Sequence, residues 1–152
     1  MIDADQLKRN ILNDMRVELA EEFDKNFDRK AFFTSKWKRR TNPNAKGSLL
    51  MVTGTMRRSI KAEVRDKGVR FSSAVPYAAI HNEGGTETKS VRQHTRTGKK
   101  GKQHTVRAHT RKFTMPQRQF VGDGKRTQEL IKGVISDNLA DYNMELAKFI
   151  KQ

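Results

Sequence analysis

Cysteine is absent from this sequence of 152 residues, and aromatic residues make up only 7% of it. Without cysteine there can be no disulfide scaffold, no thiol catalysis and no zinc site of a cysteine-containing type. Hydrophobic residues reach 34%, which is low but above the range typical of disordered chains. We therefore expect one modest core in a single domain that covers residues 1–152.

Long hydrophobic runs are also missing. No window approaches the roughly 18 apolar residues that a transmembrane helix needs, so we expect a soluble protein that is not inserted in a membrane. The first six residues are acidic and polar, whereas a secretory signal starts with basic residues and continues with an apolar run. We expect no export by that route.

Positive charge, by contrast, is abundant. Lys and Arg together number 32 against 17 Asp and Glu, which gives a formal net charge of +15. A polyanion, an acidic protein surface or a membrane headgroup is a natural neighbour for such a chain. The net charge alone does not choose among these three.

The first half of the chain begins with a regular apolar pattern. It predicts a long amphipathic helix from Asp5 to about Arg29, with Asp3 or Asp5 as its N-cap. The stripe consists of Leu7, Ile11, Met15, Leu19, Phe23 and Phe27. The opposite face carries charges of both signs, so it faces either water or another subunit.

Residues 29–48 have a different character, because aromatic and basic residues alternate before a turn-rich stretch. We expect a connecting loop in which Phe32, Phe33 and Trp37 either plug a hydrophobic edge or stack on nucleic-acid bases. An apolar step then leads into a short helix that Thr53 or Thr55 caps.

Two alternating stretches next to each other predict a β-hairpin with one buried face. Alternation holds over residues 60–64 and again over 69–73, and the sequence Asp66-Lys67-Gly68 turns the chain between them. Pro76 ends the second strand. A single helical turn containing Tyr77, Ile80 and His81 follows, and Gly84 or Gly85 ends it.

Residues 86–113 concentrate the positive charge and contain a small repeat. The sequence Val91-Arg-Gln-His-Thr-Arg96 matches Val106-Arg-Ala-His-Thr-Arg111 at five of six positions, and Gly98-Lys-Lys-Gly101 between them is typical of a tight turn. The segment carries one carboxylate, Glu87, and nine cations: Lys89, Arg92, Arg96, Lys99, Lys100, Lys102, Arg107, Arg111 and Lys112. The pattern predicts a protruding basic β-hairpin that contacts either a phosphate backbone or an acidic protein.

The C-terminal part returns to ordinary folding signals. We expect a short strand over residues 113–122, with Pro116 at an edge or at a strand start. A second long helix follows, with Asp123 or Thr127 as its start signal. Its stripe consists of Leu130, Ile131, Val134, Ile135, Leu139, Tyr142, Leu146, Phe149 and Ile150. The fold class is therefore α+β: long N-terminal and C-terminal helices packed on a small antiparallel sheet, with the protruding hairpin between.

The chemistry-bearing residues do not form a convincing catalytic set. His81-Asn82-Glu83 matches the His-x-Glu half of a zinc deaminase signature, but the cysteine half is missing. The three histidines His94, His104 and His109 lie among Arg and Lys, whose charge opposes binding of a dication. We expect no enzyme, no metal and no cofactor.

Four motifs stand in an order and spacing that resemble a known family. After Trp37 in the loop, they occupy residues 50–60, 69–73, 76–85 and 115–122. Together they resemble the phage virion morphogenesis family, which comprises tail-completion or tail-terminator-like proteins of tailed bacteriophages, and the resemblance spans roughly residues 1–150. Met56 replaces the usual Leu, a change that conserves volume. The basic segment 86–113 is longer than the motif requires, so the family assigns it no role.

The resemblance implies structural roles for a set of motif residues. These are Trp37, Thr53, Gly54, Ser59, Ile60, Tyr77, Ile80, His81, Gly84, Pro116, Arg118, Phe120 and Gly122. Thr53 and Gly54 would turn the chain into its short helix, and Tyr77, Ile80 and Phe120, with Val121, would close the core. His81 and Glu83 would be turn or interface residues.

The resemblance also implies a function. It predicts a structural protein of the virion neck or head-proximal tail end, assembled in the host cytoplasm. The protein would act as a ring, of six copies by analogy, that completes the tail and meets tail-tube and head-tail connector proteins, with non-specific DNA contact in the channel. The alternative is a free nucleic-acid-binding protein that uses the basic hairpin together with Phe32, Phe33 and Trp37.

Overall fold

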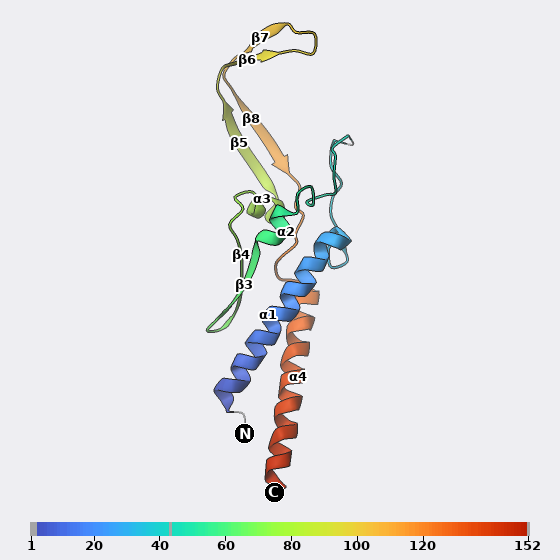
Figure 1. Cartoon of the computed structure of the whole chain (residues 1–152), viewed down its shortest axis with the longest axis vertical. Coiled ribbons are helices and arrows are strands. Elements are labelled where there is room, and N and C mark those ends of the chain that lie inside the picture. Colours follow the sequence, from blue (N-terminus) through green and yellow to red (C-terminus); the bar gives the residue numbers. More distant parts are fainter. Residues whose placement is uncertain (1–2, 43, 152) are drawn as a thin grey trace.

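Two long helices form the body of the molecule, and β-structure extends from one end of this body (Figure 1). The computed structural model describes residues 3–42 and 44–151. Helices α1 (Ala4–Arg29) and α4 (Lys125–Ile150) lie side by side in opposite directions. The predicted α+β class is confirmed. Among the described residues, no helix is both long enough and apolar enough to cross a membrane.

Helix α1 is capped by a local hydrogen bond at its start and by a left-handed residue at its end. An Oδ1 atom of Asp3 accepts from the backbone N–H of Gln6 at 2.6 Å, so Asp3 is the N-cap that the sequence left open between two candidates. Lys30 takes a left-handed conformation (φ 52°) and ends the helix. Full burial is confined to the second half of α1, because only that half is covered by the β-structure and loops: Leu19, Phe23, Asn26 and Phe27.

Helix α2 (Thr55–Ser59) follows a small hairpin of strands β1 (Ala31–Phe32) and β2 (Ser35–Lys36). The predicted Thr cap is wrong: Gly54 occupies the N-cap in a left-handed conformation (φ 68°), and no side chain caps the helix. Arg57 instead fixes α2 to α1, since its guanidinium binds the carboxylates of Asp24 and Asp28, the latter at 2.7 Å. The hydrogen bonds from Arg57 lower the pKa of Asp24.

The hairpin after α2 is confirmed, but its predicted buried face is only partly buried, and Val64 on that face is 37% exposed. Strands β3 (Ile60–Arg65) and β4 (Gly68–Ser73) pair antiparallel with Ile60 opposite Ser73. Helix α3 (Ala78–Glu83) then ends at Gly84. Tyr77 is not a core residue as expected: its side chain remains 45% exposed and lies edge-on to the ring of His81 at 6.1 Å.

The basic segment forms two ladders instead of one continuous hairpin over 86–113. Strand β5 (Gly85–Val91) pairs with β8 (His109–Met115), and β6 (His94–Thr97) pairs with β7 (Gln103–Val106). Pairing stops at residues 92–93 and 107–108, where the ribbon bends (Figure 1). We call residues 85–115 the arm; it points away from the two-helix body.

The segment before α4 also differs from expectation. Strand β8 ends at Met115, and residues 116–122, called the strap below, are not a strand. Pro116 has no N–H to donate to a ladder, and the strap finds its hydrogen bonds elsewhere. Neither predicted start signal caps α4, whose N-cap is Gly124. Thr127 instead donates its hydroxyl to the carbonyl of Gly122 at 3.0 Å.

The core lies where α1, α2, α3 and the strap meet. Its buried members are Phe27, Trp37, Met56, Ala78 and Phe120. Partly buried apolar residues pack against them: Leu49, Leu50, Met51, Ile60, Val75 and Val121. The ring of Phe27 touches those of Trp37 and Phe120, with centroid separations of 5.8 and 5.0 Å. Each ring comes from a different part of the chain, so this contact ties helix, loop and strap together.

One polar residue sits inside this core. The amide of Asn26 is fully buried; its Nδ2 donates to the carbonyl of Phe120 at 3.1 Å, and its Oδ1 accepts from the backbone N–H of Phe33 at 2.9 Å. The side chain thus satisfies one backbone group on each of two loops. Such buried groups are costly to leave without a partner.

Replacing Asn26 by Ala leaves both backbone groups of the loops unsatisfied. We expect the free energy of unfolding to fall by about 1–3 kcal/mol for each group. Urea denaturation measures the change. The matched control is Asn13→Ala, an exposed position of the same helix, which we expect to change stability by less than about 0.5 kcal/mol. Equal effects of the two substitutions would contradict the role given to Asn26.

Candidate functional site

Side chains from three other segments of the chain hold the strap by hydrogen bonds to its backbone. Trp37 donates its indole N–H to the carbonyl of Gln119 at 2.6 Å. The Oδ1 of Asn82 accepts from the backbone N–H groups of both Phe120 and Val121, at 2.9 and 3.0 Å. Asn26 completes the set from α1. The strap is therefore held in an irregular but fully specified path.

Arg118 connects the strap to two other segments. Its backbone N–H donates to the carbonyl of His81 at 2.8 Å, and its guanidinium donates to the carbonyls of Lys38 at 3.0 Å and Arg39 at 3.3 Å. The side chain is buried, and burial, followed by the nearby charge of Arg40, lowers its pKa. Arg118 thus acts as a structural clamp whose partners are two carbonyls and the Sδ of Met115.

His81 is half-buried under this clamp. Its Nδ1 has no hydrogen-bond partner among the described residues. Burial, and then the charge of Arg118, lower the pKa of His81. Glu83 is exposed on the same short helix. The described residues contain no group of three or more His, Asp or Glu that could hold a metal.

Gly84 allows the strap to pass close to the end of α3. Its φ is +72°, and a Cβ atom placed there would lie 2.8 Å from the backbone N of Gln117 and 3.0 Å from its Cα. Both obstacles are backbone atoms, which cannot rotate away. Only glycine fits this position without moving the strap.

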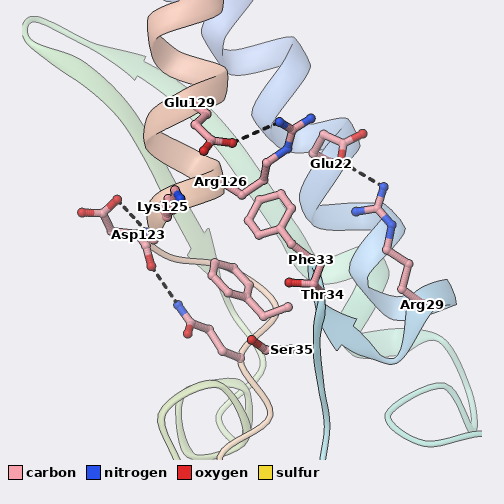
Figure 2. A pocket seen from close by; sticks show the side chains of 12 residues that line it. Glu22, Arg29, Phe33, Thr34, Ser35, Asp123, Lys125, Arg126 and Glu129 are labelled. Atoms are coloured by element: carbon pink, nitrogen blue, oxygen red, sulfur yellow. Dashed lines mark hydrogen bonds and ion pairs between the residues drawn. The ribbon is translucent and has the colours of Figure 1, made fainter.

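A hollow of about 730 Å³ lies between the end of α1, the β1–β2 hairpin and the start of α4 (Figure 2). Two ion pairs occupy its wall: Glu22 with Arg29 at 3.0 Å, and Arg126 with Glu129 at 3.2 Å. Phe33 also lines it. Asp123 and Lys125 also line the hollow, and neither takes part in an ion pair of the described residues.

The arm has the opposite character, because its charges are not paired. None of the nine cations of residues 86–113 forms an ion pair with a carboxylate in the part of the chain that the structure describes. All nine are exposed. The register even sets Lys89 directly opposite Arg111. Like charges opposite each other destabilise a ladder, so this arrangement favours an external anion.

The sequence repeat coincides with the bend of the arm. Val91 pairs with His109, and His94 pairs with Val106. The first residue of each copy of the repeat therefore lies opposite the fourth residue of the other copy. Within each copy the histidine Nδ1 donates to the carbonyl two residues before it, at 3.0 Å for His94 and 2.9 Å for His109. The third histidine, His104, pairs with Arg96 instead.

Sequence reasoning missed three polar residues of this site. Asn26 interrupts the apolar stripe of α1 between Phe23 and Phe27, and that interruption was an available signal of a buried amide. Asn82 lies between His81 and Glu83, whose spacing suggests a catalytic pair and gives no sign of a structural amide. Arg57 gave no signal, because its partners on α1 are distant in sequence.

Comparison with known proteins gives one clear match. A model described as the phage virion morphogenesis family matches residues 3–140, which is most of the chain. The searches of curated proteins and of solved structures returned no match. The matched range includes the strap, the arm and all the buried residues of the core.

Gly84→Ala tests the close passage of the strap. A side chain at this position is strained by its φ and collides with Gln117, so we expect the free energy of unfolding to fall by about 1–3 kcal/mol. Gly68→Ala is the control, because a Cβ there meets nothing within 4 Å. Chemical denaturation that gives equal losses for the two variants would contradict the steric requirement.

His81 makes stability depend on pH. Its folded pKa lies below the ordinary value of 6.5, so the unfolded chain takes up the proton first as the pH falls. Stability is therefore lost as pH drops from about 6.5 towards the folded pKa, by at most about 1.4 kcal/mol per pH unit. We expect His81→Gln to reduce this slope in urea titrations, while exposed His104→Gln keeps it. An unchanged slope in His81→Gln would refute the assignment.

Proposed function

The chain belongs to the phage virion morphogenesis family, and from that premise we propose that it completes or terminates the tail and supports head-tail joining at the neck. Membership gives it a structural role in virion assembly. The finer role is our proposal. It places the protein in the virion, at the neck or the head-proximal end of the tail, after assembly in the host cytoplasm.

One observation carries this proposal: several motif residues hold the core and the strap in place, whereas the arm leaves its charge available to partners. Trp37, Arg118 and Gly84 hold the strap, and His81 is half-buried beside it. None of them offers an exposed reactive group. The arm, by contrast, projects from the body with unpaired charge (Figure 1). This division fits a protein that acts by contact.

The end of α4 supports assembly of several copies. Four large apolar side chains in the second half of α4 are exposed: Leu139 at 42%, Met144 at 57%, Phe149 at 61% and Ile150 at 73%. A run of exposed large apolar side chains favours a protein contact. We propose that a second copy of this chain covers it and that repetition of the contact closes a ring, with six copies as our working number.

In such a ring the arms provide the contact with neighbouring components. Each copy brings nine cations on one thin ribbon, so a ring concentrates positive charge in one zone. The expected neighbours are tail-tube and head-tail connector proteins and the DNA in the channel. Opposite charges would steer docking and fix its register.

The rival function, a free nucleic-acid-binding protein, depends on three aromatic side chains that are engaged elsewhere. Trp37 is buried at 8% exposure. Phe32 and Phe33 pack against Phe23, each with a centroid separation of 6.2 Å. Rings held in this way are not free to stack on bases. This packing favours the assembly role.

Replacing residues 89–111 by Asn-Gly tests the proposal. Thr88 and Lys112 face each other in the register, so a two-residue turn closes the shortened hairpin without disturbing the body. We expect a folded protein that still forms a ring but no longer joins heads to tails. Thermal unfolding, light scattering and electron microscopy of a joining reaction measure the three properties.

A second variant tests whether positive charge outside the arm also matters for joining. Lys61 and Lys67 lie exposed on the β3–β4 hairpin, which points away from the arm (Figure 1). We expect Lys61→Gln with Lys67→Gln to join heads and tails normally. Normal joining by the shortened arm, or collapse of the fold when the arm is removed, would contradict the proposal.

A further inference from the structure

The chemistry of the arm points to a particular partner. Its nine cations have no carboxylate partner within the described residues, and Lys89 is held opposite Arg111. An anion of repeating charge would relieve this repulsion along the ribbon. The candidates are single-stranded nucleic acid, an acidic protein surface and duplex DNA.

Single-stranded nucleic acid fits poorly. Proteins that bind single strands place aromatic side chains under successive bases. Residues 86–112 contain no Phe, Tyr or Trp. The one aromatic residue of the arm, Phe113, is partly buried near its foot in β8, so the length of the arm beyond it offers no platform on which an unpaired base could stack.

A stable protein interface also fits poorly. The centre of such an interface is apolar or aromatic, and a few buried anchors carry most of its binding energy. Between residues 86 and 112 the arm has only two large apolar side chains, Val91 and Val106. Both are already partly covered by the ribbon itself. The arm has no exposed anchor.

Duplex DNA fits the groups that remain. Phosphate oxygens are bound by Arg, Lys, Ser and Thr side chains, which fix the protein on the duplex without reading its sequence. Exposed hydroxyl residues line the arm between its cations: Thr86, Thr88, Ser90, Thr95, Thr97, Thr105 and Thr110. No carboxylate other than Glu87 lies among them.

The repeat gives this surface an internal order. Each copy places one arginine at the bend and one in the adjoining ladder, Arg92 with Arg96 and Arg107 with Arg111. The two copies lie on opposite strands with reciprocal pairing of Val and His. The bend thus holds Arg92 and Arg107, and the ladder on each side of it adds one more arginine, an arrangement that suits the two antiparallel backbones of a duplex.

We propose that the bend of the arm is a binding site for the phosphate backbones of duplex DNA, contacted equivalently by the two copies of the repeat. The site deepens the proposed neck function, since it commits the arm to the DNA in the channel instead of to an acidic protein. Binding is independent of sequence and falls steeply with salt.

Fluorescence anisotropy with the full-length protein tests the site. The probes are a short mixed-sequence duplex, a single strand of the same nucleotide number, and polyglutamate as an acidic competitor. We expect the duplex to bind more tightly than the single strand and polyglutamate to compete weakly. Equal or tighter binding of the single strand, or displacement by equimolar polyglutamate, overturns the proposal.

Two matched double variants test the equivalence of the copies. One carries Arg92→Gln with Arg96→Gln, and the other carries Arg107→Gln with Arg111→Gln. Each lost phosphate contact reduces the magnitude of the slope of log affinity against log salt by about 0.9. We therefore expect this magnitude to fall by about 1.8 in either variant. The control is Lys61→Gln with Lys67→Gln, which removes the same charge from the β3–β4 hairpin. A loss confined to one copy, or an equal loss in the control, contradicts the site.

The same proteins separate this inference from the proposed function. All variants are also measured for ring formation and head-tail joining. Wild-type protein that forms rings and joins heads to tails without binding duplex overturns the DNA site and leaves the neck function standing. Wild-type protein that binds duplex as proposed but neither forms rings nor joins tails overturns the neck function.

Discussion

The structure depends on two side-chain amides that hold a segment without regular secondary structure. Asn26 reaches the strap from α1, and Asn82 reaches it from α3. Between them they satisfy the backbone of Phe120 on both its N–H and its C=O side. This fixes the ring of Phe120 against Phe27 and sets the point from which α4 departs. A misplaced strap would move the second long helix and the foot of the arm together.

The body and the arm differ in how their charges are paired. The body pairs many of its charges internally, as in the clamp of Arg57 on Asp24 and Asp28. The arm leaves its cations in solvent, although like charges on neighbouring strands cost stability. A chain with low hydrophobic content and one compact core gains nothing for its fold from such an arm. The stability that the arm loses through repulsion between its cations is consistent with a surface that binds a partner.

The sequence predicted regular elements well where the pattern was local. The stripe of α1, the β3–β4 hairpin and the glycine end of α3 follow directly from spacing and turn chemistry. The strap and the bend of the arm could not be predicted in this way. Residues 116–122 resemble a strand locally, and only the distant amide of Asn82 gives their N–H groups other partners. Likewise, the repeat indicated two strands, yet its copies straddle the interruption between two ladders. Long-range hydrogen bonds decided the path of the strap, whereas the bend coincides with local hydrogen bonds from His94 and His109 to carbonyls two residues earlier.

The central claim is that this chain works as an assembled structural component whose arms meet a neighbour. The most direct measurement is the mass of the full-length protein by light scattering, alone and with purified tail tubes. With 17.5 kDa per copy, the account predicts a discrete multiple of that mass, bound at the tube end. A protein that stays monomeric in both conditions would contradict the account.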